Sequence, residues 1–420
     1  MLQPTTTGQA VGRAVATTGA EPVDALGCCS PQGARPGTDV DVLVIGAGQA
    51  GLAAGYALRR TGVSFTLVDA AAHVGGSWAG YYDSLTLFSP AGRSALPGLP
   101  FPGDPGRYPH RDEVAAYLRR YAEHFALPVR TGTRVQRVRW DGAAFSVSLA
   151  ARGEDGARSS LRAGAVIAAS GGFGAPHLPD LPGAREFGGQ MLHVGRYRSP
   201  TAFAGQRVVV VGAGNSAVQV ATELAEVATV TLASRAPVRW RSQRPLGVDV
   251  HHWTRFSGVE ALPLGRHAQQ VVGVLDDGRY RAALAAGRPG RRPMFTTLTP
   301  TGVRWADGVE EDVDTVVLAT GYRPDLGYLR DLVLPDGRSA LDARQDPMHR
   351  RGVSTTVPGL GYVGLPGQHG LASATLRGAG PDARRVVRRL TDQLRRRAPT
   401  PAPPGPASRT TTRPDPRSPR

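Results

Sequence analysis

The sequence contains no lysine, so each of its 50 basic residues is an arginine. The formal net charge of +16 at pH 7 would attract an anionic partner such as a nucleic acid. The arginines are nevertheless spread along the whole chain, and part of the excess lies at its two ends. Because nucleic-acid-binding proteins combine a basic stripe with a recognition motif, and the sequence shows no such motif, we predict no nucleic-acid partner.

Cysteine is almost absent as well, since Cys28 and Cys29 are the only two in the chain. These residues are adjacent, so no CxxC pair is available for a dithiol redox centre or a zinc site. His251 and His252 have no third ligand at useful spacing, and we interpret them as surface or pocket wall. We therefore predict no metal site.

Long apolar runs are also missing. No stretch reaches the about 18 apolar residues of a membrane span, and the N-terminus lacks the charged head and apolar run of a secretory signal. We predict a cytoplasmic protein without a membrane span. Residues 1–37 and 394–420 are rich in Thr, Gly, Pro or Arg without apolar period. This composition predicts a disordered leader and a disordered Pro/Arg-rich tail.

A glycine motif follows the first apolar run of the body. Residues 40–45 predict a buried parallel strand, and Gly46, Gly48 and Gly51 come next. A helix is expected over 52–61 and a second strand over 63–68, which ends at Asp69. Gly46 permits the tight turn, Gly48 lets the backbone approach a pyrophosphate, and Gly51 lets the helix pack closely. With an acid placed to accept ribose hydroxyls, this arrangement predicts an FAD site.

The same motif recurs after a strand expected at 208–211. Gly212 and Gly214 are followed by Ser216 and by Ala217, a tolerated replacement of the third glycine. A helix is expected over 216–227 and a strand over 229–233, after which comes Arg235. A carboxylate there would repel a 2′-phosphate, whereas an arginine can pair with it. The second site therefore favours NADPH over NADH, with a solvated surface arginine as the alternative reading of Arg235.

Two more apolar strands, expected over 166–169 and 315–319, fit the sheet of the first motif. The second ends in Thr320 and Gly321, which we expect to contribute to cofactor binding because the chain must turn there near a bound cofactor. The resulting fold is α/β, with two Rossmann-like dinucleotide-binding domains and the NADPH domain inserted into the FAD domain. The predicted boundaries place the FAD domain at 38–182 and 313–393, and the NADPH domain at 183–312.

At this point the chain resembles the class B flavin-dependent monooxygenases over nearly its whole body. VIGAGQAGLAA (44–54) looks like their FAD fingerprint, GGSW (75–78) with Trp78 is similar to their GGxW element, and LATGYRPD (318–325) to their ATGY segment. The family signature between the two Rossmann units matches at five positions: Phe187, Gly189, His193, Tyr197 and Arg198. The Baeyer–Villiger version would have Trp followed by Pro or Asp where Tyr197 and Arg198 stand, which favours heteroatom oxygenation.

The resemblance implies a cofactor-driven mechanism with FAD and NADPH. NADPH would reduce the flavin, which would react with oxygen to give a flavin hydroperoxide, and a soft N, S or As atom of a small molecule would be oxygenated. His193 would join the two domains, and no residue receives a catalytic role. The family's active-site Asn has no counterpart in 81–103. A flavin reductase without oxygen insertion and a non-catalytic redox sensor stay open, as does a homodimer.

Overall fold

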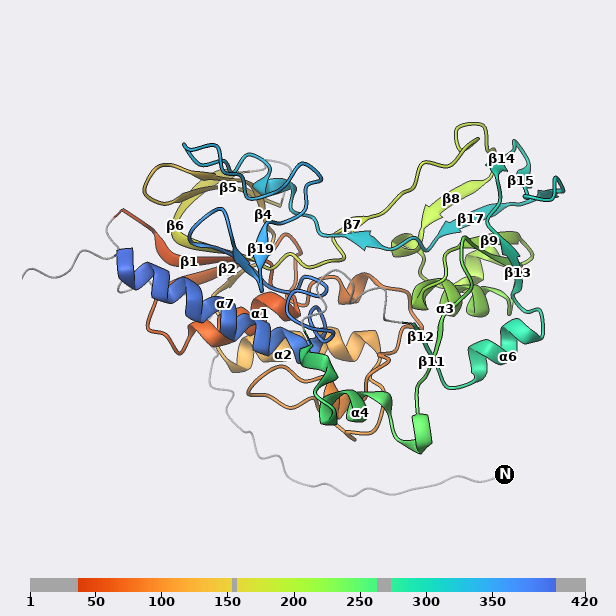
Figure 1. Ribbon diagram of the computed structural model, residues 1–420, viewed down its shortest axis with the longest axis horizontal. Helices are drawn as coiled ribbons and strands as arrows, with labels where there is room; N and C mark the ends of the chain where they lie inside the picture. Colours follow the sequence, from red (N-terminus) through yellow and green to blue (C-terminus); the bar gives the residue numbers. More distant parts are fainter. Residues whose placement is uncertain (1–36, 153–156, 263–272, 398–420) are drawn as a thin grey trace, which may run out of the picture.

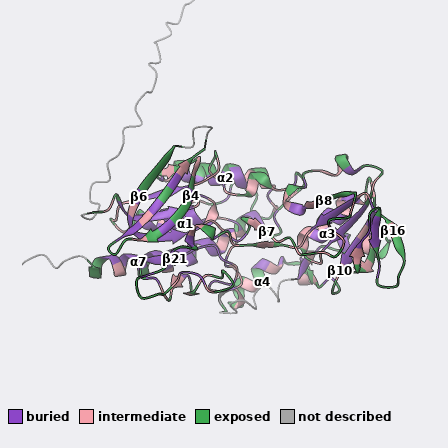
Figure 2. Cartoon of the chain, turned by 90° about the horizontal axis from the view of Figure 1, so that it is seen from above, coloured by how far each residue is buried: buried purple, intermediate pink, exposed green. Residues whose placement is uncertain are grey.

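The computed structural model describes residues 37–152, 157–262 and 273–397 and consists of two units joined side by side (Figure 1). The first unit is built on a nine-stranded sheet and the second on a five-stranded sheet. Both sheets are buried in their centres, so each unit has its own hydrophobic core (Figure 2). Cys28 and Cys29 and nearly all of the predicted leader lie outside the described residues.

The centre of the first sheet is parallel and runs in the order β21-β6-β1-β2-β3. The strands are β1 (Val40–Ile45), β2 (Phe65–Val68), β3 (Val129–Arg130), β6 (Arg158–Ala168) and β21 (Leu360–Tyr362). Alternate side chains of β1 enter two different core clusters, with Val42 and Val44 on one face and Leu43 and Ile45 on the other. A strand covered on both faces must be apolar throughout, which explains the continuous apolar run.

Helices cover one face of this sheet, and antiparallel strands extend it. The helices are α1 (Gln49–Leu58), α2 (Arg111–His124) and α7 (Leu376–Arg397). The antiparallel strands are β4 (Thr133–Trp140), β5 (Phe145–Ala151), β19 (His349–Arg350) and β20 (Val353–Ser354). The predicted helix 52–61 was placed three residues too late, because the helix already begins with the motif residues that follow Gly48.

The second sheet is entirely parallel, in the order β13-β10-β9-β17-β8. Its strands are β8 (Gln190–His193), β9 (Arg207–Val211), β10 (Thr229–Ser234), β13 (Gly290–Pro293) and β17 (Thr315–Leu318). Helices α3 (Asn215–Leu224) and α6 (Arg279–Ala285) and the small sheet β14 (Thr297–Leu298), β15 (Gly302–Arg304), β16 (Glu310–Asp312) complete the unit. The expected strands 208–211 and 229–233 are confirmed as β9 and β10.

The position of β17 corrects one expectation. The strand was assigned to the sheet of the first motif, but it pairs with β9 and β8 at the centre of the second sheet. Its four residues are all buried, and a central position in either sheet would satisfy them equally, so the sequence could not decide. We therefore expect the inserted domain to end after Leu318 rather than at residue 312. The other predicted domain boundaries stay predictions.

Two short linker strands carry the chain into and out of the second unit. They are β7 (Ala175–Pro176) and β18 (Tyr322–Arg323), which pair antiparallel beside one another between the two units (Figure 1). The chain thus enters and leaves the second unit at one place. This confirms the predicted fold class, in which one dinucleotide-binding unit is inserted into another.

One segment of the second unit leaves its own sheet. After β11 (Trp240–Ser242), the chain runs to helix α4 (Val250–Phe256), whose N-cap Asp249 accepts a hydrogen bond from Tyr108 of the first unit, and β12 (Val274–Asp276) returns beside β11 (Figure 1).

Helix α7 continues to Arg397, into the tail predicted from 394, because Leu394 is buried and prolongs the helix's apolar face. Among the described residues, no helix is long and apolar enough to cross a bilayer.

Candidate functional site

The turn between β1 and α1 has the geometry that a pyrophosphate-binding turn needs. Gly46 has φ +107°, and a Cβ there would lie 2.5 Å from the Ala169 carbonyl oxygen. A Cβ on Gly51 would lie 1.8 Å from the Gly46 carbonyl oxygen, so neither glycine can carry a side chain. At Gly48, by contrast, the nearest atom to an added Cβ is 3.5 Å away. The backbone at the N-terminus of α1 is therefore open to a ligand, as an FAD pyrophosphate would require.

Asp69 stands beside this turn at the end of β2. One of its carboxylate oxygens accepts the Ala47 N–H at 2.6 Å, and the other accepts the Ala71 N–H at 2.8 Å. Each carboxylate oxygen has a second lone pair, so both can still accept a ribose hydroxyl. Asp69 lines the same cavity as Gly46 and Gly48. Three of the residues predicted for the FAD site thus lie together, whereas Gly51 lies outside the cavity.

The second glycine turn repeats the geometry of the first. Gly212 has φ +147°, and a Cβ there would lie 2.5 Å from the Ala319 carbonyl oxygen. A Cβ on Gly214 would meet no atom within 4 Å, so this turn too leaves open space at the N-terminus of α3. Arg235 follows β10 and is exposed, at the same carboxyl edge of the sheet where the turn leaves β9. The arginine is thus near the place where a 2′-phosphate is expected.

A single cavity of about 740 Å³ connects the two units. The first unit contributes Gly46, Gly48, Asp69 and Trp78, and α3 of the second unit contributes Ser216. Asn215 and Gln219 on the same helix also line it, although the sequence did not single them out. Of the other predicted cofactor residues, Gly51, Gly212, Gly214, Arg235, Thr320 and Gly321 are not part of the wall. The cavity therefore extends from the first glycine turn to α3, the helix that follows the second turn.

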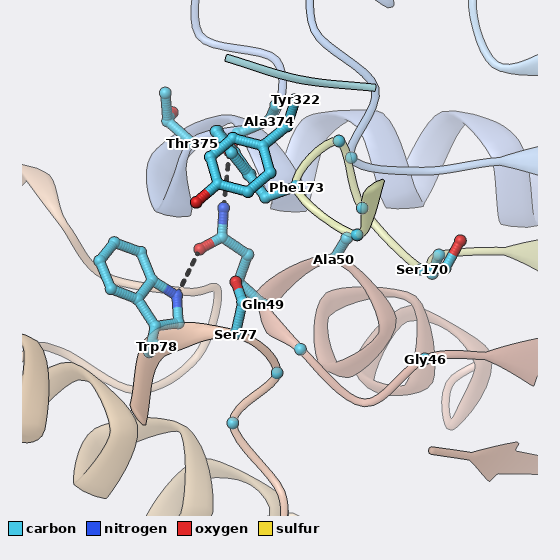
Figure 3. A pocket seen from close by; sticks show the side chains of 18 of the residues that line it. Gly46, Gln49, Ala50, Ser77, Trp78, Ser170, Phe173, Tyr322, Ala374 and Thr375 are labelled. Atoms are coloured by element: carbon cyan, nitrogen blue, oxygen red, sulfur yellow. Dashed lines mark hydrogen bonds between the residues drawn. The ribbon is translucent and has the colours of Figure 1, made fainter. Parts of the chain in front are cut away.

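Gln49 is a residue of the site that sequence reasoning missed. Its Oε1 accepts the Trp78 Nε1–H at 3.0 Å, and its Nε2–H donates to the Ala374 carbonyl oxygen at 2.7 Å (Figure 3). Ala374 has φ +69°, a conformation that disfavours a side chain. The Gln49 amide thus joins α1, the GGSW segment and the loop before α7. No local sequence pattern could predict this bridge, because Gln49 and Ala374 are 325 positions apart.

Aromatic side chains form a continuous part of the wall. Trp78, Tyr81, Phe173 and Tyr322 meet edge to face, with successive ring centroids 5.6, 6.4 and 5.6 Å apart. Burial raises the pKa of Tyr81 to about 12, so its hydroxyl is neutral at physiological pH. Phe173 and Tyr322 come from the linkers between the units. This part of the wall is uncharged, although Phe173 itself is 48% exposed.

The family signature lies at the junction of the two units. His193 Nε2–H donates to the Gly321 carbonyl oxygen at 3.0 Å, and Nδ1 accepts the Gly195 N–H at 3.1 Å. Burial lowers the pKa of His193, which favours this neutral tautomer. The Thr320 hydroxyl donates to the His177 carbonyl oxygen in the other linker. His193 thus fastens the end of β8 to the linkers, in keeping with its predicted joining role.

The other signature residues hold the neighbourhood of His193 in place. A Cβ on Gly189 would lie 2.4 Å from the Phe187 ring, so the glycine makes room for it. The Tyr197 hydroxyl donates to Glu223 of α3 at 2.9 Å. Arg198 donates to the Gly80 carbonyl oxygen, two residues after Trp78. The signature therefore connects the second unit to the cavity wall and does not itself reach the cavity.

Comparisons with known proteins agree with this geometry. The model of the pyridine nucleotide-disulphide oxidoreductase family matches residues 43–261. An uncharacterized CzcO-like oxidoreductase of Geobacillus kaustophilus is 32% identical over 352 residues, covering 83% of this chain and 97% of that protein. The indole-3-pyruvate monooxygenase YUCCA1 of Oryza sativa is 29% identical over 395 residues, covering 84% and 92%.

A solved structure gives the same picture. The flavin-containing monooxygenase of Stenotrophomonas maltophilia superposes with a TM-score of 0.70 at 38% identity. The match covers 84% of this chain and 99% of that one. Cyclohexanone monooxygenase, at 20% identity, shares only the fold, with a TM-score of 0.61 over 84% of this chain and 87% of that one.

Proposed function

This chain belongs to the pyridine nucleotide-disulphide oxidoreductase family as a class B flavin-monooxygenase-like enzyme that uses FAD and NADPH, and we propose that it oxygenates a soft heteroatom (N, S or As) of a small molecule. For a thioether, the balanced reaction consumes one O₂, one NADPH and one proton and yields the sulfoxide, NADP⁺ and water. The partners are therefore a small-molecule substrate and molecular oxygen. A cytoplasmic location and a homodimer stay predictions.

One observation supports the proposal: Gly46, Gly48 and Asp69 of the expected FAD site and Ser216 of the expected NADPH site line one cavity, and its lining contains no thiol among the described residues. A disulfide reductase needs a dithiol beside the flavin to pass electrons on, and the only cysteines of the whole sequence are Cys28 and Cys29. The aromatic wall instead suits a reaction that must exclude water, since a dry site limits the release of activated oxygen as hydrogen peroxide. The cavity thus supports oxygen insertion over disulfide reduction.

The residues have distinct tasks in this mechanism. Gly46, Gly48 and Asp69 would hold FAD, whose ring system supplies the redox and oxygen chemistry when bound. Gly212, Gly214, Ser216 and Arg235 would hold NADPH. Four aromatic residues of the wall would exclude water: Trp78, Tyr81, Phe173 and Tyr322. No side chain is required to attack the substrate, so the protein's contribution is binding, orientation and dryness.

Isotopically labelled oxygen gas tests the proposal. The purified FAD-loaded enzyme would be supplied with NADPH and a panel of thioethers, tertiary amines and trivalent arsenicals, and the products analysed by mass spectrometry. We expect one labelled oxygen atom per product molecule and about one NADPH consumed per product. If NADPH oxidation is rapid but no substrate of any class gains the label, while a quinone or similar acceptor is reduced, the enzyme is a reductase.

A further inference from the structure

The segment 243–260 of the second unit lies on the first unit, away from its own sheet, and we call it the clasp. Helix α4 forms its middle and lies apart from the second sheet, on the side of the first unit (Figure 1). The clasp meets the first unit at two places, one centred on Asp249 and the other on Glu260. Neither contact belongs to the nucleotide turns, the linkers or the signature.

The first contact is centred on the carboxylate of Asp249, a residue that is only 8% exposed. One oxygen accepts the Tyr108 hydroxyl of the first unit at 2.6 Å and the Gln243 Nε2–H at 2.6 Å. The other accepts the backbone N–H of His251 at 2.8 Å and its Nδ1–H at 2.7 Å. Burial alone would raise the pKa of Asp249, but these hydrogen bonds outweigh it and lower the pKa. The carboxylate therefore stays ionised and holds all three side chains.

The Asp249 cluster reaches the cavity through Phe88. The second Nε2–H of Gln243 donates to the Phe88 carbonyl oxygen at 2.9 Å. The His251 ring stacks on the Phe88 ring, with centroids 5.9 Å apart and planes 21° from parallel. Phe88 itself lines the cavity and is 41% exposed. One face of this wall residue is thus supported by a buried histidine of the other unit.

The second contact fixes the far end of the clasp. Glu260 accepts the Arg377 Nε–H at 2.9 Å, and the Thr254 hydroxyl donates to the same carboxylate at 2.8 Å. Both charged side chains are largely buried, at 18% exposure for Arg377 and 15% for Glu260. Arg377 follows Leu376, which lines the cavity. Both ends of the clasp therefore reach elements of the first unit that form the cavity wall.

We propose that Asp249 and His251 are positioning residues for the reaction, which hold Phe88 in the cavity wall and thereby tie the shape of the cavity to the placement of the second unit. The effect on oxygenation rests on the proposed function, whereas the effect on Phe88 does not. A rigid aromatic wall at this point would restrict how a substrate lies and how much water enters. Loss of the support would let Phe88 change rotamer while both nucleotide turns stay intact.

The chain offers a matched pair of variants. His251→Ala removes the buried ring that supports Phe88, and His252→Ala removes the neighbouring exposed ring on the same helix. We expect His251→Ala to raise the KM of the oxygenated substrate and the fraction of NADPH that ends as peroxide, each by about fivefold, with kcat changed less than about twofold. Affinity for FAD should stay unchanged, and His252→Ala should behave like the wild type.

Hydrogen–deuterium exchange of the FAD-loaded protein supplies a readout that needs no substrate. In His251→Ala the peptide covering residues 84–92 should exchange faster than in the wild type and in His252→Ala. Tyr108→Phe keeps its ring and loses only one bond to Asp249, so it should change the same peptide to a smaller extent. Equal exchange in all four proteins would overturn the inference, even if oxygenation were established. Faster exchange confined to His251→Ala and Tyr108→Phe, in an enzyme that oxygenates nothing, would support the clasp and reject the proposed function.

Discussion

Replacing Asp382 by asparagine should make the protein more stable at alkaline pH and leave it unchanged at acid pH. Asp382 lies in α7, is 3% exposed, and one of its carboxyl oxygens has no hydrogen-bond partner. Burial raises the pKa of this carboxyl from its ordinary 3.8 to about 6, although a hydrogen bond from Ser373 and the charge of Arg385 oppose the rise. The ionised form is therefore disfavoured in the folded protein.

The direction of the pH effect on stability depends on whether the folded or the unfolded protein binds the Asp382 proton more tightly. The folded protein holds it up to a pH of about 6, whereas the unfolded chain loses it near 3.8. Below both values the carboxyl is neutral in both states and adds no cost. As the pH rises through this window, the free energy of unfolding falls by about 3 kcal/mol, since one pKa unit corresponds to about 1.4 kcal/mol. Above pH 7 the whole cost is present.

Asparagine has nearly the same shape and cannot ionise, so Asp382→Asn should lose this pH dependence. The assay is denaturant unfolding of the FAD-saturated wild type and variant from pH 4.5 to pH 8. The variant should gain about 1 kcal/mol over the wild type at pH 4.5, where part of the cost is already present, and about 3 kcal/mol toward pH 8. Asp392→Asn on the same helix is the control, because the Asp392 side chain is 46% exposed. A difference between Asp382→Asn and wild type that does not vary with pH would refute the reasoning.

Three further outcomes test the site itself. Gly48→Asp should abolish FAD binding by filling the open space at the turn without a clash in the fold, and a purified variant that keeps the flavin absorbance would disprove the first site. Arg235→Ala should reduce the NADPH-over-NADH preference in kcat/KM by about tenfold, whereas an unchanged ratio would move the 2′-phosphate elsewhere. Gln49→Met should cost about 1–2 kcal/mol of unfolding free energy through its two lost bonds, and an unchanged denaturation midpoint would show that the bridge is dispensable.

The parts of the site that the sequence predicted all depend on local geometry. Gly46, Gly48 and Gly51 lie within one turn and one helix, where the space each glycine must leave is set by its immediate neighbours. Asp69 follows a strand that pairs in parallel with β1, so the carboxyl ends of the two strands must meet. The same holds for Gly212 and Gly214. Short-range rules were sufficient for both nucleotide turns.

The parts that the sequence did not predict depend on contacts between distant segments. The Gln49 bridge spans 325 positions, and the bond from Tyr108 to Asp249 spans 141. Single side chains at such separations leave no period or spacing to detect. His251 was interpreted as surface or pocket wall, and the structure places its ring just behind the wall, buried against Phe88. The assignment of β17 failed for a related reason, since an equally buried place exists in both sheets.

The second unit is attached around the cavity at several separate places, and this arrangement determines what mutations should do. The β7–β18 pair joins the linkers, Arg198 binds Gly80 just after the GGSW segment, and the clasp holds Phe88 and Arg377. A body fixed at well-separated points cannot rotate without breaking one of them, so the two nucleotide sites keep one relative position. The cofactors carry the chemistry, so loosening one attachment should have little effect on the rate of NADPH oxidation. It should instead lower the fraction of oxidised NADPH that yields oxygenated product and raise the fraction that yields peroxide.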